Sequence, residues 1–498
     1  MTWKALSEFQ WGTMGPEIIL VAAALLLLTL ELLLPKNASR KIVGWIGLLS
    51  VVGSLVWLFT LYSHKPISLL AGSFKLDSFG LLFKTILLIG AILVLLLALG
   101  DKSIAERSEY YTLFITALIG AMYMASSSDL ITLFVGLELL SISSYILVGI
   151  QKRREGSSEA ALKYVINGGI STAITLFGLS YTYGLTGTTN ITEMNLALQQ
   201  GIPSSNGFLM ILAFVLVFVG LSFKLASVPF HMWAPDVYEG APTPVTAFLA
   251  TVSKTGGFII VLRIFLAIFT GALLMKEQKS VFEVMQPVIA TLAALSMIIG
   301  NTIALKQNSL KRILAYSGIA HGGYVLVAFV SISPFMFEGI WFYLLAYTFM
   351  TIGILTIVYN VQQQRGSDSL SSFAGLIKTN PFLAITMTIF VLSLAGIPLT
   401  AGFIGKLNIF LGAFVQVKGY YVLGGILLLT TVVSYFYYFG ILQNIFFRSG
   451  EERKVVLPKT HLFVVLVCAI LTIVLGIKPS LALDVFHKLD IVKDFFMA

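Results

Sequence analysis

The chain has 498 residues, of which 57% are hydrophobic and only 11% are charged. This balance excludes a soluble globular domain and predicts a polytopic membrane protein. The net charge of +9 is distributed among short connections. That distribution is typical of membrane orientation signals and argues against binding to nucleic acid.

Hydropathy divides the chain into about fourteen predicted membrane spans, so we expect an all-α fold that forms one membrane domain over residues 1–498. The N-terminal segment lacks the pattern of a cleavable signal, and we expect the first span to be retained. In chain order the predicted spans are 15–34, 42–62, 78–100, 108–127, 129–150, 161–185, 207–230, 242–272, 284–305, 311–330, 335–360, 381–416, 421–447 and 460–477.

Two of these spans are predicted to be broken. The segment 381–416 is too long for one straight crossing, and its Gly-Ile-Pro triplet at 396–398 interrupts a continuous helix. Lys224 precedes an Ala-Ser-Val-Pro stretch at 226–229, so the seventh span is predicted to be interrupted as well. Broken helices at membrane depth are typical of binding sites in transporters.

The order of the spans suggests an internal repeat. Spans 4–8 and 9–13 form two sets of five, and an odd number of crossings makes the second set inverted relative to the first. Lys and Arg are concentrated in the odd-to-even connections, which predicts that these connections are cytoplasmic and that both termini lie outside. The predicted parts are three N-terminal helices at 1–107, a first repeat at 108–272, a second repeat at 284–447, and a C-terminal helix and tail at 448–498.

Four ionisable residues lie inside otherwise apolar spans: Glu138, Lys224, Lys254 and Lys406. An ionised side chain at the bilayer centre costs about 2.5–3.5 kcal/mol on insertion scales. A chain that keeps four of them is predicted to use them to move charge. Purely structural ion pairing is the alternative, but burying pairs for stability alone is a poor use of charge.

Removing a lysine from water favours its neutral form, whereas a neighbouring carboxylate favours the ammonium form. We therefore interpret Glu138 and Lys224 as a switchable pair that is followed by further lysines. Proton transfer needs close approach or bridging water, so polar links are required between the carriers. His321 is a candidate relay, with a hydrogen-bonded core histidine as the equal alternative. The other candidate links are Ser141, Ser143, Ser144, Ser253 and Thr255.

Other charged residues in or near the spans are interpreted as structural. Lys84 is expected to snorkel to the membrane interface, with a functional role as the less favoured alternative. Arg263 is expected to anchor the outer end of its span. Glu31 is expected to pair with a basic residue of the next connection, and Lys306 is interpreted as a topology determinant.

The connection between the seventh and eighth spans carries four prolines within residues 229–244. These prolines predict a stiff, non-helical mouth on the cytoplasmic side. Asp236, Glu239 and His231 are candidates for collecting protons there. The alternative is that they cap helices or satisfy the loop backbone, and this is favoured for Asp236.

The chain itself is not expected to hold a cofactor or a metal. Its single cysteine, Cys468, cannot form an intrachain disulfide or a thiolate cluster, and its five histidines lack ligand-like spacing. No GxGxxG motif follows a strand pattern, so a dinucleotide site is not expected.

Three segments resemble a known family. Residues 223–254, FKLASVPFHMWAPDVYEGAPTPVTAFLATVSK, resemble the core motif of the antiporter-like subunits of respiratory complex I. Those subunits are related to components of multisubunit cation/proton antiporters. Within the group, residues 161–188 and the segment ILAYSGIAHGGY at 313–324 are similar to the N-type subunits.

The resemblance implies fourteen transmembrane helices, of which the seventh and twelfth are discontinuous. By matching position it implies that Glu138 is the carboxylate of the fifth helix and that Lys224 and Lys254 are the lysines of the seventh and eighth. Lys406 corresponds to the terminal group of the twelfth helix. A lysine there is similar to the N-type subunits rather than to the M-type ones, which carry a glutamate.

The resemblance also implies a function. The chain is expected to be a proton-translocating subunit of an NADH:quinone oxidoreductase in a prokaryotic plasma membrane, assembled with other membrane subunits. NADH and quinone would be used elsewhere in that complex, with no redox cofactor in this chain. The alternative is a component of a multisubunit sodium/proton antiporter, because its intramembrane charges would be similar.

Overall fold

The computed structural model describes residues 10–35, 37–415, 420–450 and 453–496, and most of them are helical. The N-terminal part contains three long helices and a small β-hairpin whose strands pair Ile67 with Leu76. Its elements are η1 (Trp11–Met14), α2 (Gly15–Leu33), α3 (Lys41–Thr60), η2 (Leu61–Ser63), β1 (Ile67–Leu69), β2 (Phe74–Leu76) and α4 (Ser78–Gly100).

In the next part, helices α6 and α8 start at acidic or polar caps. Asp129, for example, accepts hydrogen bonds from the backbone N–H groups of Ile131 and Thr132 at the start of α6. The elements are α5 (Ser108–Ser126), α6 (Leu130–Val148), α7 (Glu155–Thr186), α8 (Ile191–Gln199), α9 (Ser204–Leu225), α10 (Trp233–Gly240), α11 (Thr243–Phe248), the π-helix η3 (Leu249–Ser253), α12 (Lys254–Ile264), the π-helix η4 (Phe265–Phe269), β3 (Leu273–Leu274) and β4 (Lys279–Ser280).

The last part is also built of helices. Helix α13 opens with a capping box in which Ser280 and Glu283 satisfy each other's backbone N–H groups. The elements are α13 (Val281–Ala304), α14 (Leu310–Ser331), α15 (Met336–Arg365), η5 (Leu370–Phe373), α16 (Leu376–Thr379), α17 (Pro381–Ala395), α18 (Ala401–Val415), α19 (Tyr421–Phe447), α20 (Lys459–Ile477), α21 (Ser480–His487) and α22 (Ile491–Phe496).

The predicted all-α membrane fold is confirmed. Among the described residues, twelve helices are long and apolar enough to cross a membrane. The remaining two predicted spans are the 19-residue helix α5 and the interrupted pair α17–α18. In each predicted set of five, the fourth member is the interrupted span. The break follows α9 in the first set and separates α17 from α18 in the second. The inversion of one set relative to the other and the boundaries of the parts stay predictions.

Two features of the chain differ from the sequence-based expectation. The connection after the seventh span is not free of helix, because α10 occupies Trp233–Gly240 with Pro235 in its first turn, where a proline removes no helical hydrogen bond. The eighth span contains two π-helical stretches, η3 and η4, and η3 ends directly before Lys254. Such irregular turns are frequent at functional sites.

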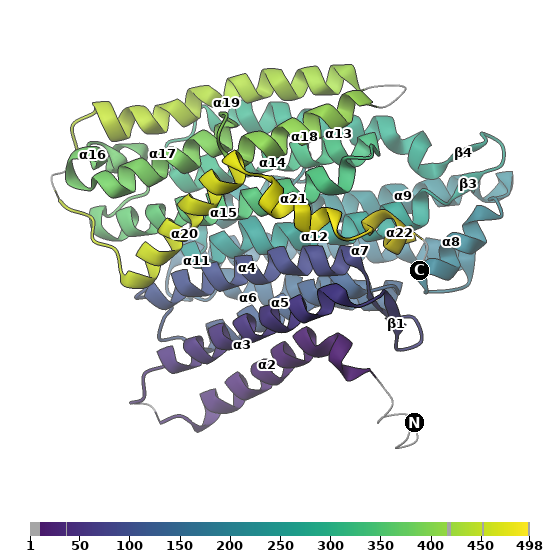
Figure 1. Cartoon of the computed structure of the whole chain (residues 1–498), viewed down its shortest axis with the longest axis horizontal. Coiled ribbons are helices and arrows are strands. Elements are labelled where there is room, and N and C mark those ends of the chain that lie inside the picture. Colours follow the sequence, from purple (N-terminus) through teal and green to yellow (C-terminus); the bar gives the residue numbers. More distant parts are fainter. Residues whose placement is uncertain (1–9, 36, 416–419, 451–452, 497–498) are drawn as a thin grey trace.

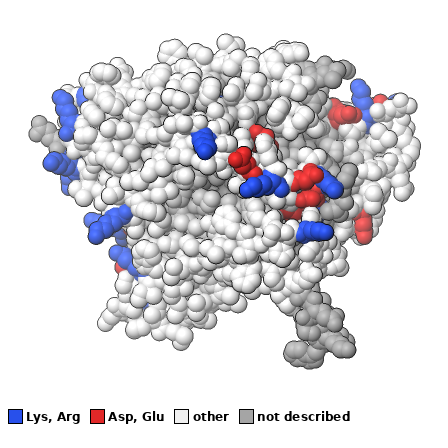
Figure 2. Space-filling view, in the orientation of Figure 1, with Lys and Arg blue, Asp and Glu red and all other residues white. Residues whose placement is uncertain are grey.

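The helices form a flat bundle in which α2 and α3 lie at one edge and α19 at the other, while α20–α22 run across the face shown in Figure 1. Within the described part of the chain, the apolar stretches of α14 and α15 are completely buried, and the apolar stretch of the span that contains α11 and α12 is almost completely buried. Figure 2 shows a wide white surface, with Lys and Arg gathered at the left end of the bundle and mixed charges on the right half of the view. The buried helices are therefore enclosed by an apolar exterior suited to lipid.

Lys84 does not snorkel. It is fully buried in α4 and forms an ion pair with Glu17, which is also fully buried, in the first turn of α2. The carboxylate of Glu17 is favoured at that helix N-terminus by the helix dipole. The pair therefore connects the peripheral helix α2 to the buried helix α4.

Arg263 is not a membrane-interface anchor. Its guanidinium group forms a bidentate pair with Asp77, at 2.6 and 2.7 Å, and also donates to the carbonyl of Ala125. Asp77 in turn accepts from the backbone N–H of Gly80 and caps α4. Arg263 thus links the end of α12 to the start of α4 in a buried, hydrogen-bonded arrangement.

The buried ion pair yields a stability prediction. Lys84→Met leaves the carboxylate of Glu17 buried without its partner, which is expected to lower the free energy of unfolding by about 3–5 kcal/mol. The double variant Glu17→Gln/Lys84→Met removes both charges and is expected to cost clearly less than either single variant. Thermal unfolding in mild detergent measures this; a double variant as unstable as the sum of the singles would contradict it.

Candidate functional site

Glu138 and Lys224 lie beside two hydroxyl groups, those of Ser141 and Thr172, between α6, α7 and α9. The ammonium of Lys224 donates to Ser141 Oγ at 3.3 Å, and Glu138 Oε1 accepts from Thr172 Oγ1 at 2.9 Å. Ser141 and Thr172 both line a cavity of about 10 Å³ with Lys224, which is about the room for one water molecule. In the described structure each of the two charges contacts a different hydroxyl group, and no direct ion pair joins them.

Lys224 lies at the break of the seventh span, as expected. Helix α9 ends at Leu225, and Ala226 takes a left-handed conformation with φ 55°. A Cβ atom at Gly257 of α12 would lie 3.2 Å from Lys224 Cγ, so the stem of Lys224 packs one turn away from Lys254. The side chain of Lys224, at the helix break, thus lies next to the turn of α12 that begins with Lys254.

Lys254 is buried between α12, α14 and α15. Its ammonium donates to the backbone carbonyl of Gly318, and it lies 5.8 Å from the ring centroid of Tyr347. Cβ atoms at Gly318 and Gly322 would lie 3.5 and 3.7 Å from Lys254 Nζ. The ammonium of Lys254 therefore lies directly against the face of α14 that carries these two glycines.

His321 is the centre of a cluster of aromatic hydroxyls. Its Nδ1 is hydrogen-bonded to Tyr343 Oη, and its Nε2 lies 3.0 Å from Tyr438 Oη. Tyr438 Oη continues to Ser317 Oγ. A neutral imidazole donates from one nitrogen and accepts at the other, so His321 can pass a proton between two hydroxyl groups by exchanging these roles.

Lys406 lies at the break of the twelfth span. Its ammonium donates to the carbonyls of Leu394 and Ala395 at 2.8 and 3.3 Å, and these are the last two residues of α17. A helix end leaves its last carbonyls without intrahelical partners and carries partial negative charge. Lys406 therefore satisfies the helix end that the break at Gly396 creates.

Ring contacts connect Lys254, His321 and Lys406. The ring of His321 lies 5.2 Å from that of Tyr347, which faces Lys254, and 5.4 Å from that of Tyr324. The ammonium of Lys406 lies 4.9 Å from the Tyr324 ring centroid. The structure thus places the five predicted site residues in one file from α6 to α18, in which Glu138 is partly buried and the other four are buried.

The tyrosines of this file were missed by the sequence analysis. Tyr343 and Tyr347 are four residues apart on α15, which places them on one face of the helix, and this spacing is a signal that could have found them. Of the predicted hydroxyl links, Ser141 contacts Lys224 as expected. Ser144 donates to the carbonyl of Leu140 on its own helix.

The acidic residues after the seventh span form a surface ion-pair network. Asp236 pairs with Lys163 at 2.6 Å and with Arg312 at 2.9 Å, and Glu239 pairs with Arg312 at 2.8 Å. Burial raises the pKa of Asp236, but the hydrogen bonds from the two cations outweigh it and hold that pKa below its ordinary value. Burial lowers the pKa of His231. Asp236 therefore holds α7, α10 and α14 together.

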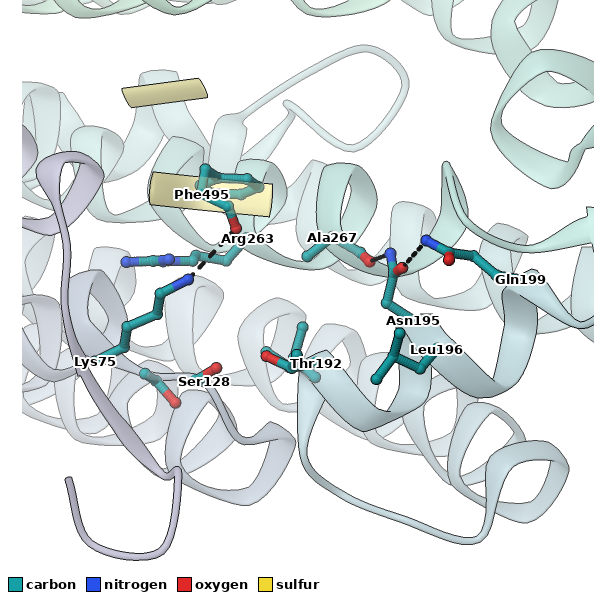
Figure 3. A pocket seen from close by; sticks show the side chains of 11 residues that line it. Lys75, Ser128, Thr192, Asn195, Leu196, Gln199, Arg263, Ala267 and Phe495 are labelled. Atoms are coloured by element: carbon teal, nitrogen blue, oxygen red, sulfur yellow. Dashed lines mark hydrogen bonds between the residues drawn. The ribbon is translucent and has the colours of Figure 1, made fainter. Parts of the chain in front are cut away.

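A polar pocket of about 220 Å³ lies at the opposite end of the bundle (Figure 3). Lys75 points across it to the carbonyl of Phe495 at 3.5 Å, and the Asn195 side chain bridges Gln199 and the Ala267 carbonyl. Arg263 lines the same pocket while it stays paired with Asp77. This pocket is separate from the residues that line the buried file.

The fold and its buried file define a multi-pass membrane protein with linked protonatable groups, and the comparisons agree. Residues 127–434 match the family model described as "NADH:quinone oxidoreductase/Mrp antiporter, TM". Two proteins named NADH-quinone oxidoreductase subunit N are similar over their full length. The one from Anoxybacillus flavithermus is 52% identical, covering 99% of this chain and 100% of its own, and the one from Geobacillus sp. (strain WCH70) is 53% identical, covering 98% and 100%.

Solved structures give the same answer. A chain of respiratory complex I from Thermus thermophilus is 32% identical with a TM-score of 0.78, covering 94% of this chain and 98% of that one. A chain of the Mrp complex from Dietzia sp. has a TM-score of 0.82 at 19% identity, covering 98% of both chains, and shows the shared fold. The chain belongs to the NADH:quinone oxidoreductase/Mrp antiporter membrane-subunit family, and its full-length similarity is to the subunit N members.

Gly396 gives a test of the twelfth-span break. Its φ of +81° is strained for other residues, and a Cβ there would lie 2.9 Å from Lys406 Cδ. Gly396→Ala is expected to lower the free energy of unfolding by about 1–2 kcal/mol and to displace the Lys406 ammonium. Thermal unfolding in detergent measures the loss. The control Gly425→Ala, in α19 with open space around its Cβ, is expected to be neutral or stabilising.

Asp236 gives a pH-dependent test. Because its pKa is lowered in the folded chain, its stabilising effect is present above the ordinary pKa and is lost as the pH falls through the lowered value. Asp236→Asn is expected to cost about 1 kcal/mol or less near neutral pH, with the difference from wild type vanishing in acid. Thermal unfolding across pH measures it. The exposed Glu277→Gln control should show no such trend, and a pH-independent loss in Asp236→Asn would contradict the assignment.

Proposed function

We propose that the chain is a proton-translocating membrane subunit of an NADH:quinone oxidoreductase. The observation that supports this best is the series of Glu138, Lys224, Lys254, His321 and Lys406 through the bundle, in which the three lysines and the histidine are buried. The full-length similarity to proteins named NADH-quinone oxidoreductase subunit N favours the same function. NADH and quinone would be used by other subunits, with which this chain assembles in a prokaryotic plasma membrane. Both termini are proposed to lie outside.

The hydroxyls between Glu138 and Lys224 suggest how the first step is controlled. A change in the charge or position of Glu138 alters the attraction that holds the proton on Lys224, and Ser141 and Thr172 supply the hydroxyl groups that contact Lys224 and Glu138 respectively. Lys224 then releases its proton toward Lys254. The helix break beside Lys224 exposes backbone carbonyls that water can use in this transfer.

The second half of the file carries the proton from Lys254 to Lys406. Tyr347 and the His321–Tyr343–Tyr438 cluster lie between them. Lys406 in its ammonium form satisfies the carbonyls at the end of α17, and it loses that stabilisation when it becomes neutral. Whether the Lys406 side chain stays at this helix end therefore depends on whether it holds a proton.

The proposed function is tested by measuring proton pumping and quinone reduction in membrane vesicles that carry the assembled complex. Lys224→Ala is expected to reduce pumping at least tenfold, because one removed carrier interrupts the file. The exposed Lys488→Ala should pump as wild type does. Full pumping by Lys224→Ala would defeat the proposal.

Two further variants separate the proposal from other roles. If the charges only hold helices together, Lys254→Gln is expected to pump almost normally, whereas a carrier role predicts loss. A sodium/proton antiporter component, the alternative suggested by the shared fold with the Mrp chain, would exchange protons for an imposed sodium gradient without NADH. The same vesicles report that exchange.

A further inference from the structure

A strongly polar vestibule of about 240 Å³ lies at the end of the bundle that carries the odd-to-even connections. This volume holds several water molecules. Its walls come from the connections after α4, α6 and α10, from the first turns of α11 and α14, and from the C-terminal part of α15. The charged groups on these walls are Asp101, Arg154 and Lys311.

Lys311 is buried in the wall of this vestibule. Only 1% of the residue is exposed, and its ammonium donates one described hydrogen bond, to the Ala241 carbonyl at 3.2 Å. An ammonium group has three donors, so two are left for water in the vestibule. Asp101, equally buried, lines the same space and accepts from the backbone and hydroxyl of Ser103.

The charges that face Lys311 come from several elements. Asp368 Oδ2 accepts from the backbone N–H of Lys311 at 3.3 Å, and Asp101 and Arg154 line the vestibule. Glu239, on α10, is engaged by Arg312. These carboxylates favour a cation at Lys311 and disfavour a bound anion such as a phosphate group. The vestibule therefore suits water and protons.

Lys311 is connected to the buried file through two helices. It lies seven residues before Gly318 on α14, which is two turns, or about 10 Å, on the same helix face. The Gly318 carbonyl is the acceptor for Lys254. The acceptor of Lys311 is the carbonyl of Ala241, which lies two residues before the start of α11, and the chain continues from α11 through η3 to Lys254. The vestibule lysine and Lys254 are thus held by the same two helices.

We propose that Lys311 is a proton-uptake group of this chain, one that supplies Lys254 in addition to the transfer from Lys224. Resting on the proposed function, the step moves one proton from the Lys311 ammonium through bridging water to the neutral amine of Lys254. The neutral Lys311 amine then takes a proton from water in the vestibule. No electron or other group is transferred.

The first test separates titration from charge. Lys311→Arg keeps a cation that can reach the Ala241 carbonyl, but a guanidinium does not release its proton at physiological pH. Pumping in vesicles is expected to fall at least fivefold while the complex stays assembled. The control Lys306→Arg, at an exposed position on the same end, should pump normally. Normal pumping by Lys311→Arg would overturn the proposal.

The second test uses chemical rescue. Lys311→Ala leaves space that joins the vestibule, and added ethylamine or 2-fluoroethylamine, which are similar in size but differ in basicity, can occupy it. A proton-uptake role predicts that the two amines restore pumping to different extents, in the order of their basicity. A structural role predicts equal rescue, and equal rescue or none would overturn the assignment.

The two proposals fail in distinguishable ways. If Lys224→Ala pumps normally, the proposed function itself is wrong. If Lys224→Ala and Lys254→Gln lose pumping while Lys311→Arg retains it, only the uptake assignment is wrong, and protons reach Lys254 by another route.

Discussion

The Lys406 ammonium and the carbonyls at the end of α17 satisfy each other inside an apolar bundle. A helix break at this depth leaves backbone carbonyls that lipid cannot solvate, and a lysine there leaves a charge that lipid cannot solvate. Each is costly alone, and together they form a stable arrangement. The same solution recurs at Lys254, which binds the Gly318 carbonyl.

This arrangement also makes the charge responsive. A lysine held by backbone carbonyls has no fixed counter-ion, so its protonation depends on nearby charges and water. By contrast, Arg263 is held by Asp77 in a bidentate pair and Lys84 by Glu17. Arg263 and Lys84 are thus fixed by carboxylates, whereas Lys224, Lys254 and Lys406 are held by carbonyls and hydroxyls along the centre of the bundle.

Burial of whole helices supports the central file. Helices α14 and α15 are enclosed by the rest of the bundle, and they carry His321, Tyr343 and Tyr347. Close packing keeps these side chains in defined rotamers, which hydrogen-bonded transfer requires.

The amino-acid sequence by itself determined the membrane class, the spans and the two breaks, because hydropathy and Gly-Pro patterns act locally along the chain. It also singled out Glu138, Lys224, Lys254, His321 and Lys406 as candidates, since an ionisable group in an apolar span is visible without any partner. Only the tertiary structure decided which groups meet. Each of three contacts joins segments that are far apart in the sequence: Ser141 with Lys224, His321 with its tyrosines, and Glu17 with Lys84. No local pattern encodes such contacts.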